Sequence, residues 1–173
     1  MKTPEKTIKT ILQGFEQQLS SEFSAYHNHC QRVYYYAKTL LLMKENHKLA
    51  VASAFHDLDI WVSDHMDYLH GSADLAVSYI ESNGLGFLPE EMKFIIQNHH
   101  KLRSIQGNIE AEAFRKADLI DLTSGMIRFN IPTSLIREIE RKFPRLGFSR
   151  IITKKVLNNA IRNPFSPFPM IRL

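Results

Sequence analysis

The spacing of apolar residues predicts that this chain folds as a series of helices. Between about residues 26 and 44, Val33, Tyr36, Ala37 and Leu40 recur at intervals of three and four, which places them on one buried helical face. The same criterion predicts helices at about 7–20, 47–55, 69–81, 89–100 and 110–124, and two more after Pro132 and Arg145. No segment shows sustained two-residue alternation, so we expect an all-α helical bundle.

Residues that end helices separate these predicted segments. The glycines of the 82–86 stretch follow one helix, Gly125 follows another, and Pro89 opens the helix between them. Two stretches, 58–67 and the proline-rich tail 163–173, are predicted to be irregular. The length allows one sizeable hydrophobic core but not two, so we expect the whole chain to form a single domain.

The composition excludes several classes of protein. Hydrophobic residues make up 44% and charged residues 23%, as in an ordinary soluble domain, and no apolar run is long enough to cross a membrane. Cys30 is the one cysteine, which excludes an intramolecular disulfide framework and a thiolate zinc site. The start of the chain lacks the apolar run of a signal peptide, so the expected location is cytoplasmic.

The charge balance is mildly basic, with a formal net charge of +4. This value suits an anionic substrate. The basic excess lies at the C-terminal end of the chain, where we expect an ordinary solvated helical face. No dense run of Lys and Arg with interleaved aromatic residues occurs, which argues against nucleic-acid binding.

Histidines and aspartates recur among apolar neighbours in four predicted helices. They are His29 near the start of one helix, His56 and Asp57 at the end of the next, His99 and His100 at the end of a third, and Asp118 within a fourth. Such side chains are costly to bury unless they are paired or bound to a metal. Four helices that each turn one such group inward can build a cation site at the centre of a bundle.

The donor types indicate which metals would suit such a site. Imidazole nitrogen with carboxylate oxygen, and no sulfur, favours Mn, Fe, Co, Ni or Zn in divalent form. A metal of this kind lowers the pKa of a bound water and polarises a phosphoryl oxygen. The residues therefore predict a divalent transition metal as cofactor.

Five short segments, in order along the chain, carry the same residues. They are HCQRVYYYA (29–37), AFHDLDIW (54–61), HGSADLA (70–76), IIQNHHK (95–101) and FRKADLIDL (114–122). In this order they resemble the motifs of the HD-domain superfamily of metal-dependent phosphohydrolases. The resemblance implies one helical domain over residues 1–173, with its core at about 25–125 and C-terminal helices and a tail at 130–173. It also implies a metal held by His29, His56, Asp57 and Asp118.

The resemblance implies further roles close to that metal. Members with two metals add two histidines, which here match His70 and His99, with His100 beside them, so we expect one or two ions. Asp57 would accept a proton from the attacking water. Asp59, two residues on, or alternatively Asp64, would help to position that water, as an acid shortly after the pair does in some nucleotidase-like members.

Cations and one aromatic residue complete the expected site. Lys101 and Arg103 follow the histidine pair and Arg32 lies one turn after His29, so these are the candidates for neutralising phosphate oxygens, with Lys101 preferred. Arg32 has an alternative role, which is to pair with a carboxylate and orient its helix. Trp61, in the stretch predicted to be irregular, is the candidate for lining a substrate pocket.

The function predicted by this resemblance is hydrolysis of a phosphate ester or phosphoanhydride. The expected partner is a small phosphorylated substrate, such as a nucleotide, and the sequence leaves a homo-oligomer open. Two alternatives use the same scaffold. One is a di-iron oxygenase, which His70 and His99 leave open, and the other is a non-catalytic signalling or binding module.

Overall fold

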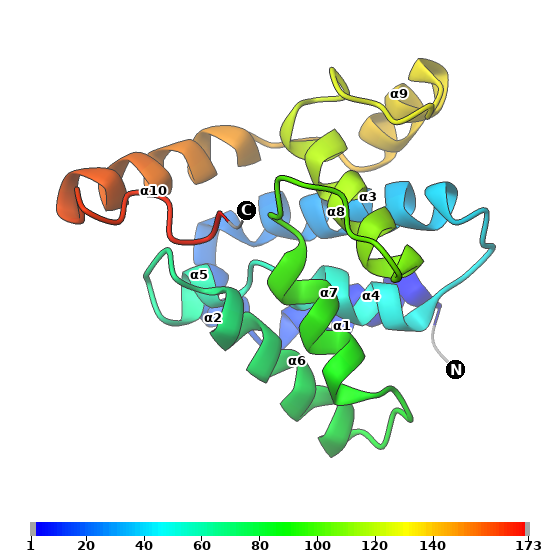
Figure 1. Cartoon of the computed structure of the whole chain (residues 1–173), viewed down its shortest axis with the longest axis horizontal. Helices are drawn as coiled ribbons and strands as arrows, with labels where there is room; N and C mark the ends of the chain where they lie inside the picture. Colours follow the sequence, from blue (N-terminus) through cyan, green and yellow to red (C-terminus); the bar gives the residue numbers. More distant parts are fainter. Residues whose placement is uncertain (1–2, 172–173) are drawn as a thin grey trace.

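The structure is a computed structural model that describes residues 3–171. Over this part of the chain it is a helical bundle without β-strands, which confirms the predicted all-α fold (Figure 1). In chain order the helices are α1 (Pro4–Gln13), α2 (Glu16–Leu19), the 3-10 turn η1 (Ser20–Glu22), α3 (Phe23–Leu40), α4 (His47–Phe55), α5 (Asp59–Val62), α6 (Leu69–Ser82), α7 (Pro89–Asn98), α8 (Ile109–Leu122), α9 (Thr133–Lys142) and α10 (Phe148–Arg162).

Side-chain caps and prolines set the starts of several helices. Asn46 and Asn108 each accept a hydrogen bond of 2.9 Å from the backbone N–H three residues on, and so begin α4 and α8. Pro4 and Pro89 lie in the first turn of α1 and α7, where a helix needs no N–H donor. These signals are local, so the predicted starts of α4, α7 and α8 agree closely with the structure.

Two segments differ from the prediction. The expected helix at 7–20 is divided, because α1 ends at Gln13 and the chain turns at Gly14 before the short α2 begins. The stretch 58–67, expected to be irregular, contains the single turn of α5. A helix of four residues shows too little periodicity to be found from the sequence.

The central element of the bundle is α4. Every side chain from 49 to 55 is buried, because Ala50, Ala52 and Ala54 are small enough to let other helices approach. It packs against α1, α3, α6 and α7, while α8 packs along α3. His56 follows directly on α4, so the chain leaves this helix at the centre of the molecule.

The C-terminal region is attached more loosely. Phe148 anchors the start of α10, and most of the remaining side chains of this helix are half-buried or exposed. In Figure 1, α10 projects from the body of the bundle and the tail runs back beneath it. Met170 in the tail packs with Ile60, Met66, Tyr68 and Leu69 in a second hydrophobic cluster. Within residues 3–171, no helix is both long and apolar enough to cross a bilayer.

Candidate metal centre

Six side chains from four helical segments meet inside the bundle, and we call them the His/Asp cluster. They are His29 from α3, His56 and Asp57 from the end of α4, His99 and His100 from the end of α7, and Asp118 from α8. His100 is half-buried and the others are at most 3% exposed. The structure thus brings together all four residues expected to bind one metal and two of the three expected to bind a second.

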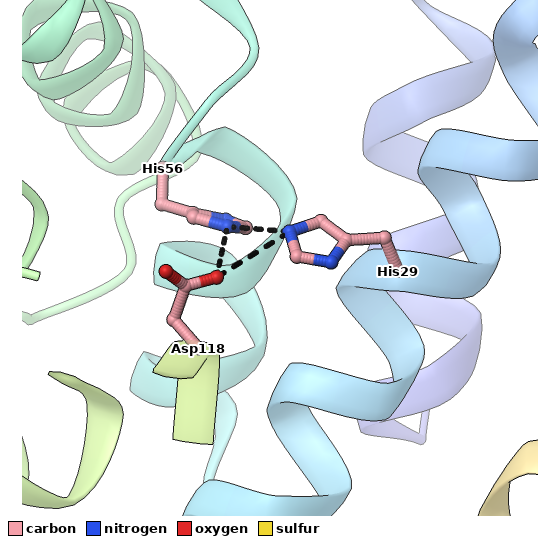
Figure 2. A group of neighbouring side chains, drawn as sticks. All are labelled: His29, His56 and Asp118. Carbon is pink, nitrogen blue, oxygen red and sulfur yellow. Dashed lines mark hydrogen bonds and ion pairs between the residues drawn. The ribbon is translucent and has the colours of Figure 1, made fainter. Parts of the chain in front are cut away.

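Two imidazoles and one carboxylate form the tightest part of the cluster. The Nε2 atoms of His29 and His56 lie 3.0 Å apart. Oδ1 of Asp118 lies 3.6 Å from the first of these nitrogens and 3.7 Å from the second. Figure 2 shows the three side chains facing one another from three different helical segments. Three donor atoms at these distances can share one cation.

Asp57 connects this group to the end of α7. Its Oδ2 atom lies 3.7 Å from Nε2 of His29 and 3.5 Å from Nε2 of His56, and its Oδ1 atom lies 3.2 Å from Nε2 of His99. His56, Asp57 and His99 therefore form a second group that could hold a metal. The two groups share His56, whose Nε2 lone pair can bind only one ion, so a second ion would depend on the remaining group, His99, His100 and Asp118.

His100 is the member of the cluster that solvent reaches most easily. Its side chain is 18% exposed, and its Nδ1 lies 3.6 Å from Oδ2 of Asp118. On its other side, Nε2 of His100 forms a hydrogen bond of 2.7 Å with the hydroxyl of Tyr68. The open side of the cluster is therefore next to His100 and Tyr68.

Backbone carbonyls fix the protonation of two of the histidine rings. Nδ1 of His56 lies 2.8 Å from the carbonyl oxygen of Ser53, and Nδ1 of His99 lies 2.6 Å from that of Ile96. A carbonyl oxygen only accepts, so each Nδ1 carries the proton that it donates. In the neutral rings the Nε2 lone pairs then point into the cluster, which is the arrangement of metal-binding histidines.

Asp121 accepts a hydrogen bond from Nδ1 of His29, and so fixes the proton on that nitrogen as the backbone carbonyls do for His56 and His99. Its Oδ2 atom lies 2.7 Å from Nδ1 of His29, while Nε and a terminal nitrogen of Arg32 donate to its two oxygens at 2.6 and 2.9 Å. Arg145 donates to its backbone carbonyl. Sequence reasoning missed Asp121, although it follows Asp118 by three residues, the spacing that places two side chains on one face of a helix.

Asp118 shows that the cluster fits a metal. Both of its carboxylate oxygens are buried and lack a hydrogen-bond partner in the described part of the chain. A buried carboxylate without hydrogen bonds is expensive, and the few such groups in folded proteins call for an explanation. A cation held between Asp118 and the Nε2 lone pairs would satisfy both oxygens.

The acids and the histidines shift one another's pKa values. Burial raises the pKa of Asp57 and of Asp118, but the surrounding histidines more than offset this, and both values fall below the ordinary one. Burial likewise opposes a charge on His29, yet the contacts with Asp121 and Asp57 raise its pKa. Because their pKa values are lowered, the carboxylates of Asp57 and Asp118 are ionised at neutral pH, as metal ligands must be.

His100 differs from His29 in this respect. Burial and the neighbouring His99 lower the pKa of His100 to about 4. Its ring is therefore neutral at physiological pH and keeps a lone pair for a ligand. Its Nε2 is engaged by Tyr68, so Nδ1, 3.6 Å from Asp118, is the nitrogen that faces the cluster.

Three candidates lie elsewhere than the sequence suggested. Arg32, expected to contact substrate, is fully buried and held by Asp121 and two backbone carbonyls, so it takes the alternative role of orienting α3. Asp59, expected to position water, packs over Gly71, where its carboxylate fills the space of a missing side chain. His70, expected at a second metal, is exposed and hydrogen-bonded to Gln97 outside the cluster.

The remaining candidates, Trp61, Lys101 and Arg103, are not members of the cluster. Trp61 is half-buried, donates its Nε1–H to Glu22 at 2.5 Å and packs against Tyr26, with ring centroids 4.5 Å apart. Lys101 follows His100 directly and is half-buried, and Arg103 is exposed on the same loop. Lys101 and Arg103 therefore lie on the loop next to the open side of the cluster.

Comparison of the chain with protein-family models, with curated proteins and with solved structures found no match. The cluster geometry and the order of the motifs are therefore the grounds on which its function is argued.

Proposed function

We propose that this protein is a metal-dependent phosphohydrolase of the HD-domain kind. In this proposal His29, His56, Asp57 and Asp118 hold one divalent transition metal, and His99 and His100 offer ligands for a second. The order of these residues along the chain and their convergence in the bundle both support the proposal.

The observation that carries the proposal is that both carboxylate oxygens of Asp118 are buried, lie 3.6 to 3.7 Å from three imidazoles, and lack a hydrogen-bond partner among residues 3–171. They face a group of imidazoles whose Nδ1 atoms are already engaged, so that the Nε2 lone pairs of His29, His56 and His99 converge. Lone pairs and carboxylate oxygens at 3.0 to 3.7 Å repel one another unless a proton or a metal lies between them. The donor set of nitrogen and oxygen, without sulfur, favours Mn, Fe, Co, Ni or Zn.

A metal bound here would supply a Lewis acid for a phosphoryl oxygen and a water of lowered pKa. The protein's own groups then have defined tasks. Asp57 accepts the proton of the attacking water, the water oxygen forms a bond to phosphorus, and the bond to the leaving oxygen breaks. Lys101 and Arg103, on the loop next to the open side, neutralise the remaining phosphate oxygens.

The substrate in this proposal is a small phosphorylated molecule, such as a nucleotide. The cluster is nearly closed, and His100 is its partly exposed member, so the reacting phosphate approaches from the side of His100 and Tyr68. The mildly basic chain suits an anion of this kind. Cys30 is buried and unpaired, which suits the reducing cytoplasm that we propose as the site of action.

Metal content and phosphate release, measured on the same preparation, test the proposal. The protein is purified without chelator and its metals are measured by elemental analysis. A panel of nucleotides and a generic phosphate ester is then assayed with Mn, Co, Ni, Mg and Fe. Asp118→Ala is the test variant, and Asp74→Ala, which removes an acid that is 71% exposed on α6, is the matched control.

The expected result is about one or two metals per chain in the wild type and in Asp74→Ala, with phosphate release. In Asp118→Ala both metal and activity are lost, because a metal ligand is missing. Two irons without phosphate release would favour the di-iron oxygenase instead. No metal in the wild type, or full activity in Asp118→Ala, would refute the proposal.

A further inference from the structure

A cavity of about 290 Å³ lies between α10 and the segment that contains α5. This volume is at the lower end of the range for small-molecule sites. Its floor includes Ile60 and Met66, both nearly fully buried. Met66 also packs in the hydrophobic cluster of Tyr68, whose hydroxyl contacts His100. Met66 and Tyr68 therefore lie between this cavity and His100, and no member of the His/Asp cluster lines the cavity.

One face of α10 forms the polar wall of this cavity. Lys154, Asn158 and Arg162 follow one another at intervals of four, so they lie on one side of the helix, and all three line the cavity. Lys155 adds a third cation from the adjoining side. The sequence predicted an ordinary solvated face here. In the structure Lys154, Asn158 and Arg162 are exposed, as predicted, and the same face also lines a pocket together with α5 and the loop that follows it.

The cations of this wall are only partly neutralised. Lys155 lies 3.9 Å from Asp64, whose side chain is 85% exposed. Neither Lys154 nor Arg162 forms an ion pair with another residue among those the structure describes, 3–171. The other acid at the cavity, Glu22, accepts a hydrogen bond from the indole of Trp61. Two cations left without partners, with an amide between them, favour an anion with several oxygens.

We propose that this cavity binds the phosphate groups of a small phosphorylated molecule. Lys154 and Arg162 donate to the phosphate oxygens from either end, and the side-chain amide of Asn158 donates between them. A small ligand fits better than a nucleic acid, because the cavity is bounded and its wall on α10 is charged and amide-rich. Single strands are typically held on aromatic rings along an open groove. This proposal does not depend on whether the His/Asp cluster hydrolyses phosphate esters.

Isothermal titration calorimetry with inorganic pyrophosphate tests this inference. The full-length chain is used, and a chelator keeps it free of metal. The variants Lys154→Ala and Arg162→Ala are each expected to bind about tenfold more weakly, since each loses one charge-assisted contact. Asp64→Asn is expected to bind more tightly, because it removes a carboxylate that competes for Lys155. Arg137→Ala, which removes an exposed cation from α9, is the matched control and should bind as the wild type does.

Each other outcome decides against the site. Equal weakening in Arg137→Ala and Lys154→Ala would show that pyrophosphate responds to net charge alone. Failure of the wild type to bind pyrophosphate would also overturn the inference. A short single-stranded RNA that binds with steep salt dependence, and is lost in Lys154→Ala while pyrophosphate does not bind, would make this face a nucleic-acid surface instead. None of these measurements depends on metal or on hydrolysis.

Discussion

Most polar side chains around the His/Asp cluster are buried and hydrogen-bonded, whereas those along α10 are mostly exposed. Around the cluster, Asp121 is buried against His29 and Arg32, and each imidazole Nδ1 of His56 and His99 has a backbone partner. Along α10, the exposed Lys154 and Arg162 line a partly open cavity and form no ion pair with any residue in the range 3–171. The polar groups of the buried region are held in place by partners, whereas the cations of the α10 face remain exposed to solvent.

The largest effect is expected from removing Asp121. In Asp121→Ala the guanidinium of Arg32 stays buried without its carboxylate, which should lower the free energy of unfolding by about 3–5 kcal/mol. Urea denaturation measures the loss, and Asp74→Ala, at an exposed acid, should change stability by less than about 0.5 kcal/mol.

A second substitution sharpens this test. Adding Arg32→Met to Asp121→Ala removes the stranded charge and should restore part of the lost stability. If the double variant were no more stable than Asp121→Ala alone, the unpaired guanidinium of Arg32 would not be the cause of the lost stability.

Metal binding should raise the stability of the whole bundle. At a metal concentration of about one hundred times Kd, a site present only in the folded protein adds about 2.7 kcal/mol to the free energy of unfolding. Thermal denaturation with Mn or Zn, and then with EDTA, measures the gain and its reversal. His70→Ala, outside the cluster, should keep the gain and Asp118→Ala should lose it. An equal gain in Asp118→Ala would place the metal elsewhere.

A smaller effect is expected at Glu112 on α8, and it should depend on pH. Hydrogen bonds from Arg115 and from the backbone N–H of Ile105 lower the pKa of Glu112 to about 2, although burial opposes this. The folded value lies below the ordinary 4.5, so the carboxylate stabilises the fold above that pH. The stabilisation is then lost as the pH falls through about 2.

Glu112→Gln measures this contribution. At neutral pH the variant should be less stable by about 1 kcal/mol, a value discounted for solvent screening. The difference should shrink as urea denaturation is repeated at pH values below 4.5. A difference that stays constant down to the lowest pH would mean that the charge of Glu112 is not what stabilises this turn.

The smallest effect is expected on the outer side of α10. Ile161 is 79% exposed, so Ile161→Ala should change the free energy of unfolding by no more than about 0.5 kcal/mol. Ile96→Ala, at a fully buried isoleucine of α7, should cost about 2–5 kcal/mol. Comparable losses at the two sites would show that α10 is part of the cooperative core and not an attached arm.

Local signals explain how much of the fold could be predicted. Asn46, Asn108 and Pro89 act within one helical turn, so the starts of α4, α8 and α7 could be found from neighbouring residues alone. The break at Gly14 and the single turn of α5 were missed. Gly14 interrupts an apolar pattern that otherwise continues, and α5 is too short to show a pattern.

The sequence allowed most residues of the candidate site to be predicted, but not the contacts that they make with one another. His56, Asp57 and Asp118 each stand beside apolar residues, where a polar side chain needs a partner, and the structure brings them together with His29. Asp59 and His70 have the same residue types but face away from the cluster. Which way a side chain turns at the end of a helix depends on the neighbouring helix, which no local pattern specifies.

The sequence by itself determined that this protein is helical, because periodicity and capping act over a few residues. It also singled out the six members of the His/Asp cluster as candidates, together with residues such as His70 that lie outside it. The tertiary structure decided that Asp121 would hold both His29 and Arg32, which lie about ninety residues earlier in the chain. It also decided that the basic face of α10 would enclose a cavity with α5. Both depend on how helices pack across the molecule, and packing sums many weak contacts between residues far apart in the chain.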